Sequence, residues 1–326
     1  MTDHPPNTGD PSESRQQPQK LFPASRGQFA PVSDGDSAWV CDTGTTGEER
    51  GTLVFLHSAV GNLGTFKHQL AWFAERGYRA LAYDRRGHGS TPSGRHGLKR
   101  ATPENDLLLL LEAQGISNPV HLVGAAAGGR LAADFALAHP HRVASLTLVC
   151  SMAGVAADIY PEGTSTLLPP EFLALPPYLR ELGPVYRGDN PAGTQAWRDL
   201  VEQSVPENIV SDPAKWVAKP IPTAAGDHLP RTPQSPAPAP RGLRGLAWLQ
   251  EPGGATEHGV PLHLITGDAD PYTTPSAYAR LAQALPGAAF EVVTGSGHSP
   301  YWERPDAFNT MVLHHVSAVA TQGAHA

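Results

Sequence analysis

The chain has 326 residues, of which 40% are hydrophobic and 17% charged, and its formal net charge is −7 at pH 7. This composition is typical of a globular protein with a sizeable core, and the negative charge argues against a nucleic-acid partner. Two cysteines are too few for a disulfide framework, and the sequence has neither a run of 18 apolar residues nor a signal-peptide core. We therefore expect a cytoplasmic protein without a membrane partner.

The first 27 residues are rich in proline, glutamine and serine and contain almost no large apolar side chains. Such a segment buries too little apolar surface to offset the conformational entropy that ordering would cost. We predict a disordered tail over residues 1–27.

From residue 28 onward, short apolar runs alternate with segments of helical periodicity. The segment after residue 102 shows a complete helix pattern, because Thr102 stands at the N-cap, Pro103 in the first turn and Gly115 just beyond the end. This alternation indicates an α/β fold with a mostly parallel sheet covered by helices on both faces. The predicted strands are 37–41, 51–57, 78–83, 120–123, 143–150, 261–266 and 289–294, and the predicted helices are 66–76, 102–114, 130–139, 274–285 and 305–320.

A proline-rich segment interrupts this alternation. Residues 161–240 contain 16 of the 33 prolines, which excludes sheet interior and permits only short helices, expected at 171–182 and 191–203, with a loop near 230–240. We predict a helical lid insertion over 156–245, which separates the two halves of one core domain, 28–155 and 246–326. The large apolar residues of the insertion either cover a small, largely apolar ligand or only pack the lid onto the core. They are Phe172, Leu173, Leu175, Tyr178, Leu179, Tyr186 and Trp197.

The most informative motif follows the predicted strand 120–123. Gly124-Ala125-Ala126-Ala127-Gly128 has the spacing of the G-x-S-x-G turn that exposes a nucleophilic serine between a strand and a helix, but an alanine stands in the serine position. The methyl group of Ala126 cannot attack a carbonyl. Any chemistry here therefore proceeds without a nucleophile at residue 126.

Four segments in order along the chain resemble motifs of the α/β-hydrolase superfamily, over roughly residues 30–320. They are Leu53-Val54-Phe55-Leu56-His57-Ser58-Ala59, Asp84-Arg85-Arg86-Gly87-His88-Gly89, the turn at 124–128, and Gly267-Asp268-Ala269-Asp270-Pro271 with the later Gly297-His298. The resemblance implies the α/β-hydrolase fold with an inserted lid. It also implies the chain order of elbow, acid and histidine.

The resemblance places catalytic roles on particular residues. His298 is the expected proton acceptor, and Asp270 is expected to hold the other ring nitrogen, with Asp268 as the competing acid. The backbone N–H groups of Ala127 and of Ser58 or Ala59 are expected to form an oxyanion hole, which the alanine at 126 leaves intact. His57 and Asp84 are interpreted as structural.

Loss of the nucleophile of a catalytic triad costs on the order of a millionfold in turnover, so an ordinary serine esterase mechanism is excluded. We favour an enzyme that acts on a small, largely apolar carbonyl compound (an ester, lactone or diketone-like molecule) by general-base catalysis. Lyase or cofactor-free oxygenase chemistry, an inactive small-ligand-binding protein and a Ser→Ala variant of an ordinary serine hydrolase remain alternatives. A substitute nucleophile is a further alternative, with Cys150, Ser151 and Ser299 as its candidates.

No cofactor or metal is expected. The chain has no G-x-G-x-x-G after a strand and no phosphate-binding loop motif, so no nucleotide or flavin is implied. His139-Pro140-His141 and His314-His315 do not match a known ligand spacing and are interpreted as exposed helix ends. The expected partner is a small-molecule substrate, and the sequence does not define an oligomeric state.

Overall fold

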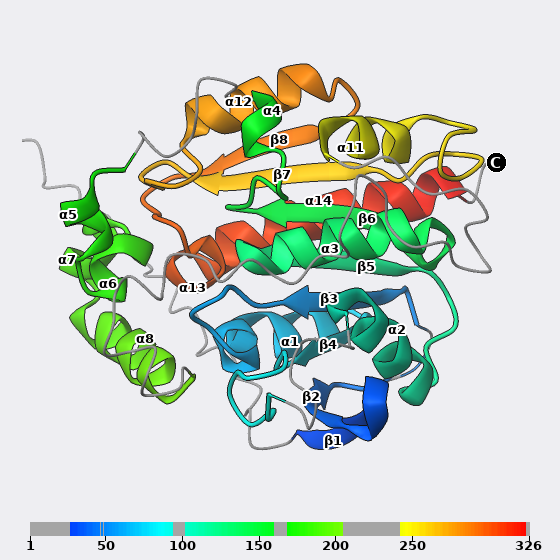
Figure 1. Ribbon diagram of the computed structural model, residues 1–326, viewed down its shortest axis with the longest axis horizontal. Coiled ribbons are helices and arrows are strands. Elements are labelled where there is room, and N and C mark those ends of the chain that lie inside the picture. Colours follow the sequence, from blue (N-terminus) through cyan, green and yellow to red (C-terminus); the bar gives the residue numbers. More distant parts are fainter. Residues whose placement is uncertain are drawn as a thin grey trace, which may run out of the picture.

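The computed structural model describes residues 27–45, 47, 49–93, 102–159, 168–204 and 242–323. They form an eight-stranded sheet in the order β1-β2-β4-β3-β5-β6-β7-β8 (Figure 1). Residues 1–26 of the predicted tail and the proline-rich loop at 230–240 lie outside the described residues. No helix in the described part of the chain is both long and apolar enough to span a membrane.

The sheet is mostly parallel, as the alternation of strands and helices predicts. Neighbouring strands from β4 to β8 pair in parallel, whereas β2 is antiparallel to β4 and β1 is antiparallel to β2. All predicted strands are present, and one short edge strand is additional. The strands are β1 Gln28–Pro31, β2 Ser37–Asp42, β3 Thr52–Leu56, β4 Arg79–Tyr83, β5 Val120–Ala125, β6 Val143–Val149, β7 Leu262–Gly267 and β8 Ala289–Val293.

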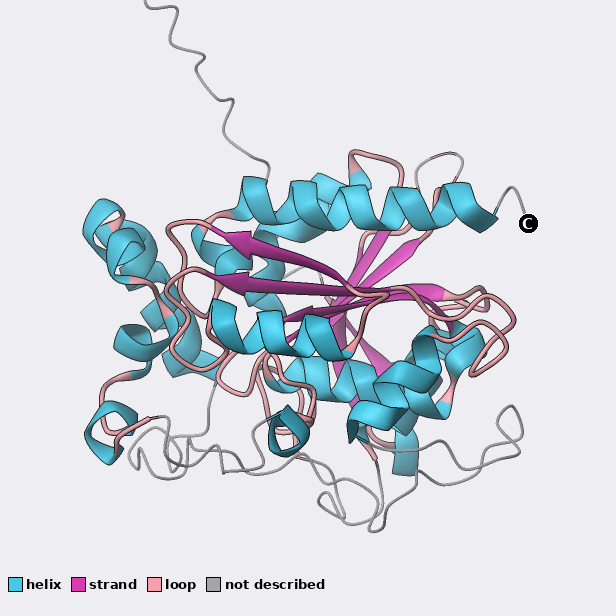
Figure 2. Cartoon of the chain, turned by 90° about the horizontal axis from the view of Figure 1, so that it is seen from above, coloured by secondary structure: helices cyan, strands magenta, loops and turns pink. Residues whose placement is uncertain are grey.

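Helices cover both faces of the sheet, which Figure 2 shows edge-on. Successive side chains of a strand point to opposite faces, so Leu122 joins one buried cluster and Val123 the other. The Leu122 cluster includes residues of α2 Pro103–Ala113, α3 Ala127–Ala138, α11 Gly242–Gln250 and α12 Pro275–Ala284. The Val123 cluster includes residues of α1 Lys67–Ala74, α13 Pro300–Glu303 and α14 Pro305–Gly323. The remaining short helices of the core are η2 Ser33–Gly35, η3 Leu63–Phe66, η5 Pro140–Arg142 and α4 Ala156–Ile159.

Four short helices, α5 Pro170–Leu173, α6 Pro177–Glu181, α7 Pro184–Asp189 and α8 Pro191–Ser204, lie beyond the carboxyl ends of β6 and β7 (Figure 1). The single helix expected at 171–182 is divided in two, because Pro177 begins α6 and holds Pro176 in an extended conformation. Tyr186 and Trp197 are buried in the Val123 cluster, so these two aromatic residues pack the helices onto the core. Helix α11 spans the predicted lid boundary at residue 245, and its Leu246 and Leu249 join the Leu122 cluster.

The turn between β5 and α3 is closely packed. A Cβ atom on Gly124 would lie 2.5 Å from the carbonyl oxygen of Gly128, and one on Gly128 would lie 2.1 Å from the carbonyl oxygen of Leu56. The small residues therefore bring the first turn of α3 against the end of β3. They also let α3 begin at Ala127, three residues before the predicted start at 130.

Gly128→Ala is expected to lower the free energy of unfolding by about 1–3 kcal/mol, because the added methyl group meets rigid backbone. Urea denaturation followed by circular dichroism measures this change. Gly188→Ala is the matched control, since a Cβ atom on Gly188 in α7 meets nothing within 4 Å. Equal stabilities of the two variants would contradict the close packing at residue 128.

Candidate active site

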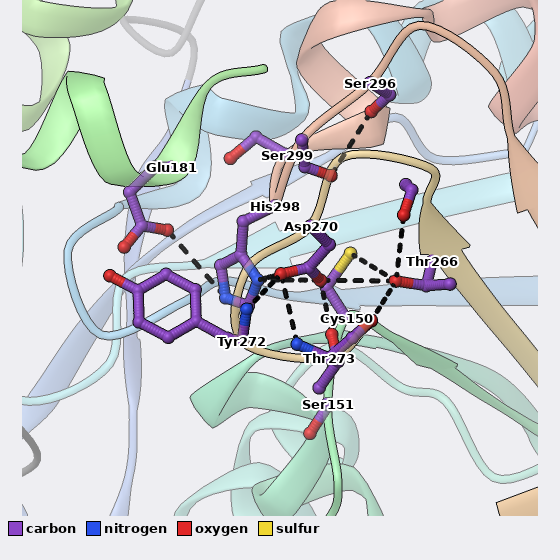
Figure 3. A network of polar contacts seen from close by, with 12 residues as sticks. Cys150, Ser151, Glu181, Thr266, Asp270, Tyr272, Thr273, Ser296, His298 and Ser299 are labelled. Atoms are coloured by element: carbon purple, nitrogen blue, oxygen red, sulfur yellow. Dashed lines mark hydrogen bonds and ion pairs between the residues drawn. The ribbon is translucent and has the colours of Figure 1, made fainter. Parts of the chain in front are cut away.

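His298 and Asp270 are paired at the carboxyl end of the sheet (Figure 3). The Nδ1 atom of His298 lies 2.9 Å from Oδ1 and 3.0 Å from Oδ2 of Asp270. Asp270 follows β7, and His298 stands in the loop between β8 and α13. Both side chains are almost completely buried. The structure therefore brings together the two residues that the sequence nominates as base and orienting acid.

The carboxylate of Asp270 is held by several donors besides His298. Oδ1 accepts hydrogen bonds from the backbone N–H groups of Tyr272 (2.8 Å) and Thr273 (3.2 Å), and Oδ2 accepts one from Thr266 Oγ1 (3.2 Å) and one from Thr273 Oγ1. Burial alone would raise the pKa of Asp270. The charge of His298 and these hydrogen bonds outweigh burial and hold the pKa below its ordinary value, so Asp270 stays ionised.

A second carboxylate lies on the opposite side of the imidazole. Oε2 of Glu181, the last residue of α6, is 3.8 Å from Nε2 of His298. Burial by itself lowers the pKa of His298, but the negative charges of Asp270 and Glu181 outweigh this and raise it to about 9. The imidazole is therefore protonated at neutral pH.

Two further acids hold the loop that carries His298. Asp268 accepts hydrogen bonds from the backbone N–H groups of Gly295 (2.9 Å) and Ser296 (3.0 Å), and its contacts are with this loop and not with the imidazole. Glu303 accepts from Gly297 N–H (2.9 Å), Ser299 N–H (3.1 Å) and Gly183 N–H (2.7 Å). Burial raises the pKa of Glu303 to about 7. These bonds fix the His298 loop to both the sheet and the start of α7.

Ala126 occupies the sharp turn between β5 and α3. Its backbone dihedrals, φ 47° and ψ −110°, are rare for a residue with a Cβ atom. Its N–H donates to Val149 O (2.9 Å), and its carbonyl accepts from Ser151 Oγ (2.6 Å). The turn thus adjoins the end of β6. Cys150, the residue between these two partners, has its Sγ within 4.8 Å of ligand atoms of Asp270 and His298.

The loop after β3 is fixed by hydrogen bonds to the carbonyl oxygen of Ser58. This oxygen accepts from His57 Nδ1 (2.7 Å) and Arg85 Nη2 (2.8 Å), and His57 Nε2 accepts from Arg85 N–H (3.0 Å). Burial, together with the charge of Arg85, lowers the pKa of His57 well below its ordinary value, which agrees with its structural interpretation. Among the described residues, no hydrogen bond uses the N–H of Ser58, Ala59 or Ala127 as donor.

The candidate substitute nucleophiles are not activated. Burial and the charge of Asp270 raise the pKa of the Cys150 thiol well above its ordinary value, so it remains protonated. Ser151 Oγ donates to the Ala126 carbonyl, and Ser299 is completely buried. Within the described ranges, Cys150, Asp270 and His298 form the one cluster with metal-ligand proximity. A metal there would have to displace the thiol proton and break the Nδ1–Asp270 hydrogen bond.

Sequence reasoning missed two residues of the site. Glu181 faces His298 from α6, and the ring of Tyr272 packs on the imidazole with 4.6 Å between ring centroids. The Tyr272 hydroxyl contacts the Glu181 carboxylate, whose pKa burial raises above its ordinary value. The sequence pointed to Tyr272 only through its position two residues after Asp270, and it contained no comparable signal for Glu181.

A cavity of about 360 Å³ opens between α6 and α8. Arg180 lines it, and the following residue, Glu181, faces His298. The rest of the lining is largely apolar, with Leu175, Pro176, Tyr178, Trp197 and Val201 beside the charged Arg198 and Glu202. The structure therefore has a mainly apolar cavity between these helices, and the residues that line it include neither His298 nor Asp270.

The chain is similar in sequence to known proteins. The chain is 27% identical over 299 residues to the 2-hydroxy-6-oxononadienedioate/2-hydroxy-6-oxononatrienedioate hydrolase of Cupriavidus pinatubonensis, an alignment that covers 90% of this chain and 96% of the relative. It is 32% identical over 145 residues to the non-heme chloroperoxidase of Streptomyces lividans, which covers 44% of this chain and 52% of that protein.

The fold is shared with solved structures. The enol-lactonase from Burkholderia xenovorans LB400 superposes with a TM-score of 0.63 at 20% identity, covering 89% of this chain and all of that one (100%). The model of the alpha/beta hydrolase family matches residues 53–311, which include Ala126, Asp270 and His298. The chain therefore belongs to the alpha/beta hydrolase family.

Proposed function

We propose that this protein is an enzyme that acts on a small carbonyl compound, such as an ester, lactone or diketone-like molecule, by proton transfer at His298 without forming an acyl-enzyme. The observation that carries the proposal is the buried Nδ1–Asp270 pair at 2.9 Å, beside a strained turn whose residue 126 has no hydroxyl group. A base and its orienting acid are thus retained where the nucleophile is missing.

The proposed chemistry follows from these groups. Neutral His298 takes a proton through Nε2, either from a water molecule that attacks the carbonyl or from a carbon next to it, and Asp270 stabilises the imidazolium that results. The backbone N–H groups of Ala127 and of Ser58 or Ala59 stabilise the negative charge on the carbonyl oxygen. The proton then returns from His298 to the leaving group or to the product.

The substrate class is supported by relatives and by the lid. The names of the Cupriavidus hydrolase and the Burkholderia enol-lactonase specify an oxo-dioate and a lactone, and both are carbonyl compounds. The cavity between α6 and α8 has a mainly apolar lining, which agrees with a small, largely apolar substrate. Arg180 and Arg198 at this cavity would also bind a negatively charged group on such a molecule, against the repulsion of Glu202 in the same lining.

The test is a panel of esters, lactones and 1,3-diketones incubated with the protein in the presence and absence of oxygen. We expect at least one compound to be consumed. A requirement for oxygen would point to oxygenase chemistry at the same base. Binding of panel compounds without consumption of any of them would instead support the ligand-binding alternative.

The rate of the proposed reaction is expected to increase with pH up to about 9, because the base acts only after His298 loses its proton. The stability contribution of His298 has the opposite dependence. Since the folded-state pKa lies above the ordinary value, this contribution is complete below about pH 6.5 and is lost as the pH rises to about 9. The pH profiles of kcat/KM and of urea unfolding, each compared with His298→Gln, measure both effects. A flat rate between pH 7 and 9 would contradict a reacting base whose pKa is raised to about 9.

A further inference from the structure

Glu181 lies opposite Asp270 across the His298 ring. Its side chain is buried, and Oε2 is 3.8 Å from Nε2 of His298 (Figure 3). Among the described residues, no hydrogen bond uses His298 Nε2, and this carboxylate is its one charged partner. The imidazole therefore lies between two carboxylates, one from the sheet and one from the lid helices.

The backbone fixes Glu181 in this position. The N–H of His298 donates to the Glu181 carbonyl (2.8 Å), so the main chains of the two residues are bonded directly. Two residues later, Gly183 N–H donates to Glu303 Oε2 (2.7 Å), and Glu303 also binds the His298 loop through Gly297 and Ser299. The end of α6 is thus tied to the loop that carries the base.

The charges around the imidazole favour its protonated form. An opposite charge within about 4–6 Å raises the pKa of a histidine, most strongly where burial excludes water. Burial raises the pKa of Glu181 above its ordinary value, and the charges of His298 and Arg180 only partly oppose this effect. The titratable and charged groups that surround His298 are Asp270 and Tyr272 after β7, Arg180 and Glu181 on α6, Glu303 on α13 and Cys150 after β6.

We propose that Glu181 is a positioning residue that pairs with the Nε2 side of His298 and so sets the pH at which the base becomes active. The use of His298 as a base rests on the proposed function, whereas the pairing itself does not. This pairing assigns to α6 a direct part in the acid–base chemistry, in addition to covering the site. The pairing transfers no proton and breaks no bond. His298 keeps its proton on Nε2 until the pH rises.

The test is the titration of His298 by NMR of the ring ¹⁵N nuclei, which needs no substrate. The His298 signal is assigned by its absence in His298→Gln. In the native protein we expect an imidazolium up to about pH 9. In Glu181→Gln, which preserves size but removes the charge, we expect a midpoint lower by at least about one pH unit. Glu171→Gln is the matched control, because Glu171 is an exposed acid on α5 and its loss should leave the midpoint unchanged.

Activity gives an independent readout. If His298 is the base, Glu181→Gln raises the rate at pH 7 by about tenfold for each pH unit that the midpoint falls, and an increase is not expected from structural damage. Glu181→Asp keeps the charge at a greater distance, so its midpoint is expected between those of the native protein and Glu181→Gln. If Glu181→Gln does not fold, the titration of Glu181→Asp tests the inference in its place.

Two results would overturn the inference: an unchanged His298 midpoint in the Glu181 variants, or a native midpoint near the ordinary value of about 6.5. Failure of the proposed function looks different. If His298→Ala leaves turnover unchanged, His298 is not the base. The NMR titration then still decides whether Glu181 pairs with it.

Discussion

His298→Ala is expected to lower kcat/KM for any substrate that the protein converts by about 10²–10⁴-fold, the usual contribution of a positioned general base. The physical reason is that Nε2 of His298 is the proposed proton acceptor, while Cys150 remains a protonated thiol and residue 126 carries only a methyl group. The measurement is steady-state kinetics on the substrate found in the carbonyl panel.

This experiment needs a check on folding, because His298 is buried between two carboxylates. His298→Gln, which keeps a polar side chain, and the thermal unfolding curve of each variant provide it. A folded His298→Ala variant with native turnover would show that proton transfer does not pass through this residue. The ligand-binding alternative would be supported by two results together: the native protein converts no compound, and the folded His298→Ala variant keeps its ligand affinity.

Ala126→Ser is expected to create esterase activity toward activated short esters, such as p-nitrophenyl acetate, at least about 10²-fold above the native protein at pH 9. The backbone at residue 126 already has the strained conformation of a strand-to-helix turn, so a serine there needs no rearrangement. A triad nucleophile is worth on the order of a millionfold, so even a poorly aligned hydroxyl should give a measurable gain. The high pH is needed because His298 is protonated below about pH 9.

The double variant Ala126→Ser/His298→Ala is the control for this gain. Its activity should fall back to the native level, since the new hydroxyl depends on His298 for activation. A gain that survives the loss of His298 would indicate that the serine is activated by another group. Absence of any gain in the single variant would contradict the proposed proximity of the turn and the base.

The fold was largely predictable from the sequence, because buried parallel strands and amphipathic helices leave strong patterns. The exceptions are weakly patterned elements. Strand β1 is a four-residue edge strand with three exposed residues, so it shows no apolar run. Helices α5 to α7 are short and begin with prolines, and their boundaries depend on local backbone constraints at residues such as Pro177.

The candidate site was predictable only in part. The pairing of His298 with Asp270 was expected from the order and spacing of the motifs, and the structure shows it in place of a pairing with Asp268. Glu181 could not be expected, since it lies 117 residues before its partner at the end of a five-residue helix without periodicity. Its position follows from the bonds that tie α6 to the His298 loop, which exist only in the folded chain.

The central claim is that the reaction proceeds by proton transfer at His298 and without a covalent intermediate. It is tested most directly by intact-protein mass spectrometry during turnover of an ester or lactone from the panel, with rapid acid quenching. We predict that the mass of the chain stays unchanged while product forms. A mass increase equal to the acyl group, located on Cys150, Ser151 or any other residue, would contradict the account.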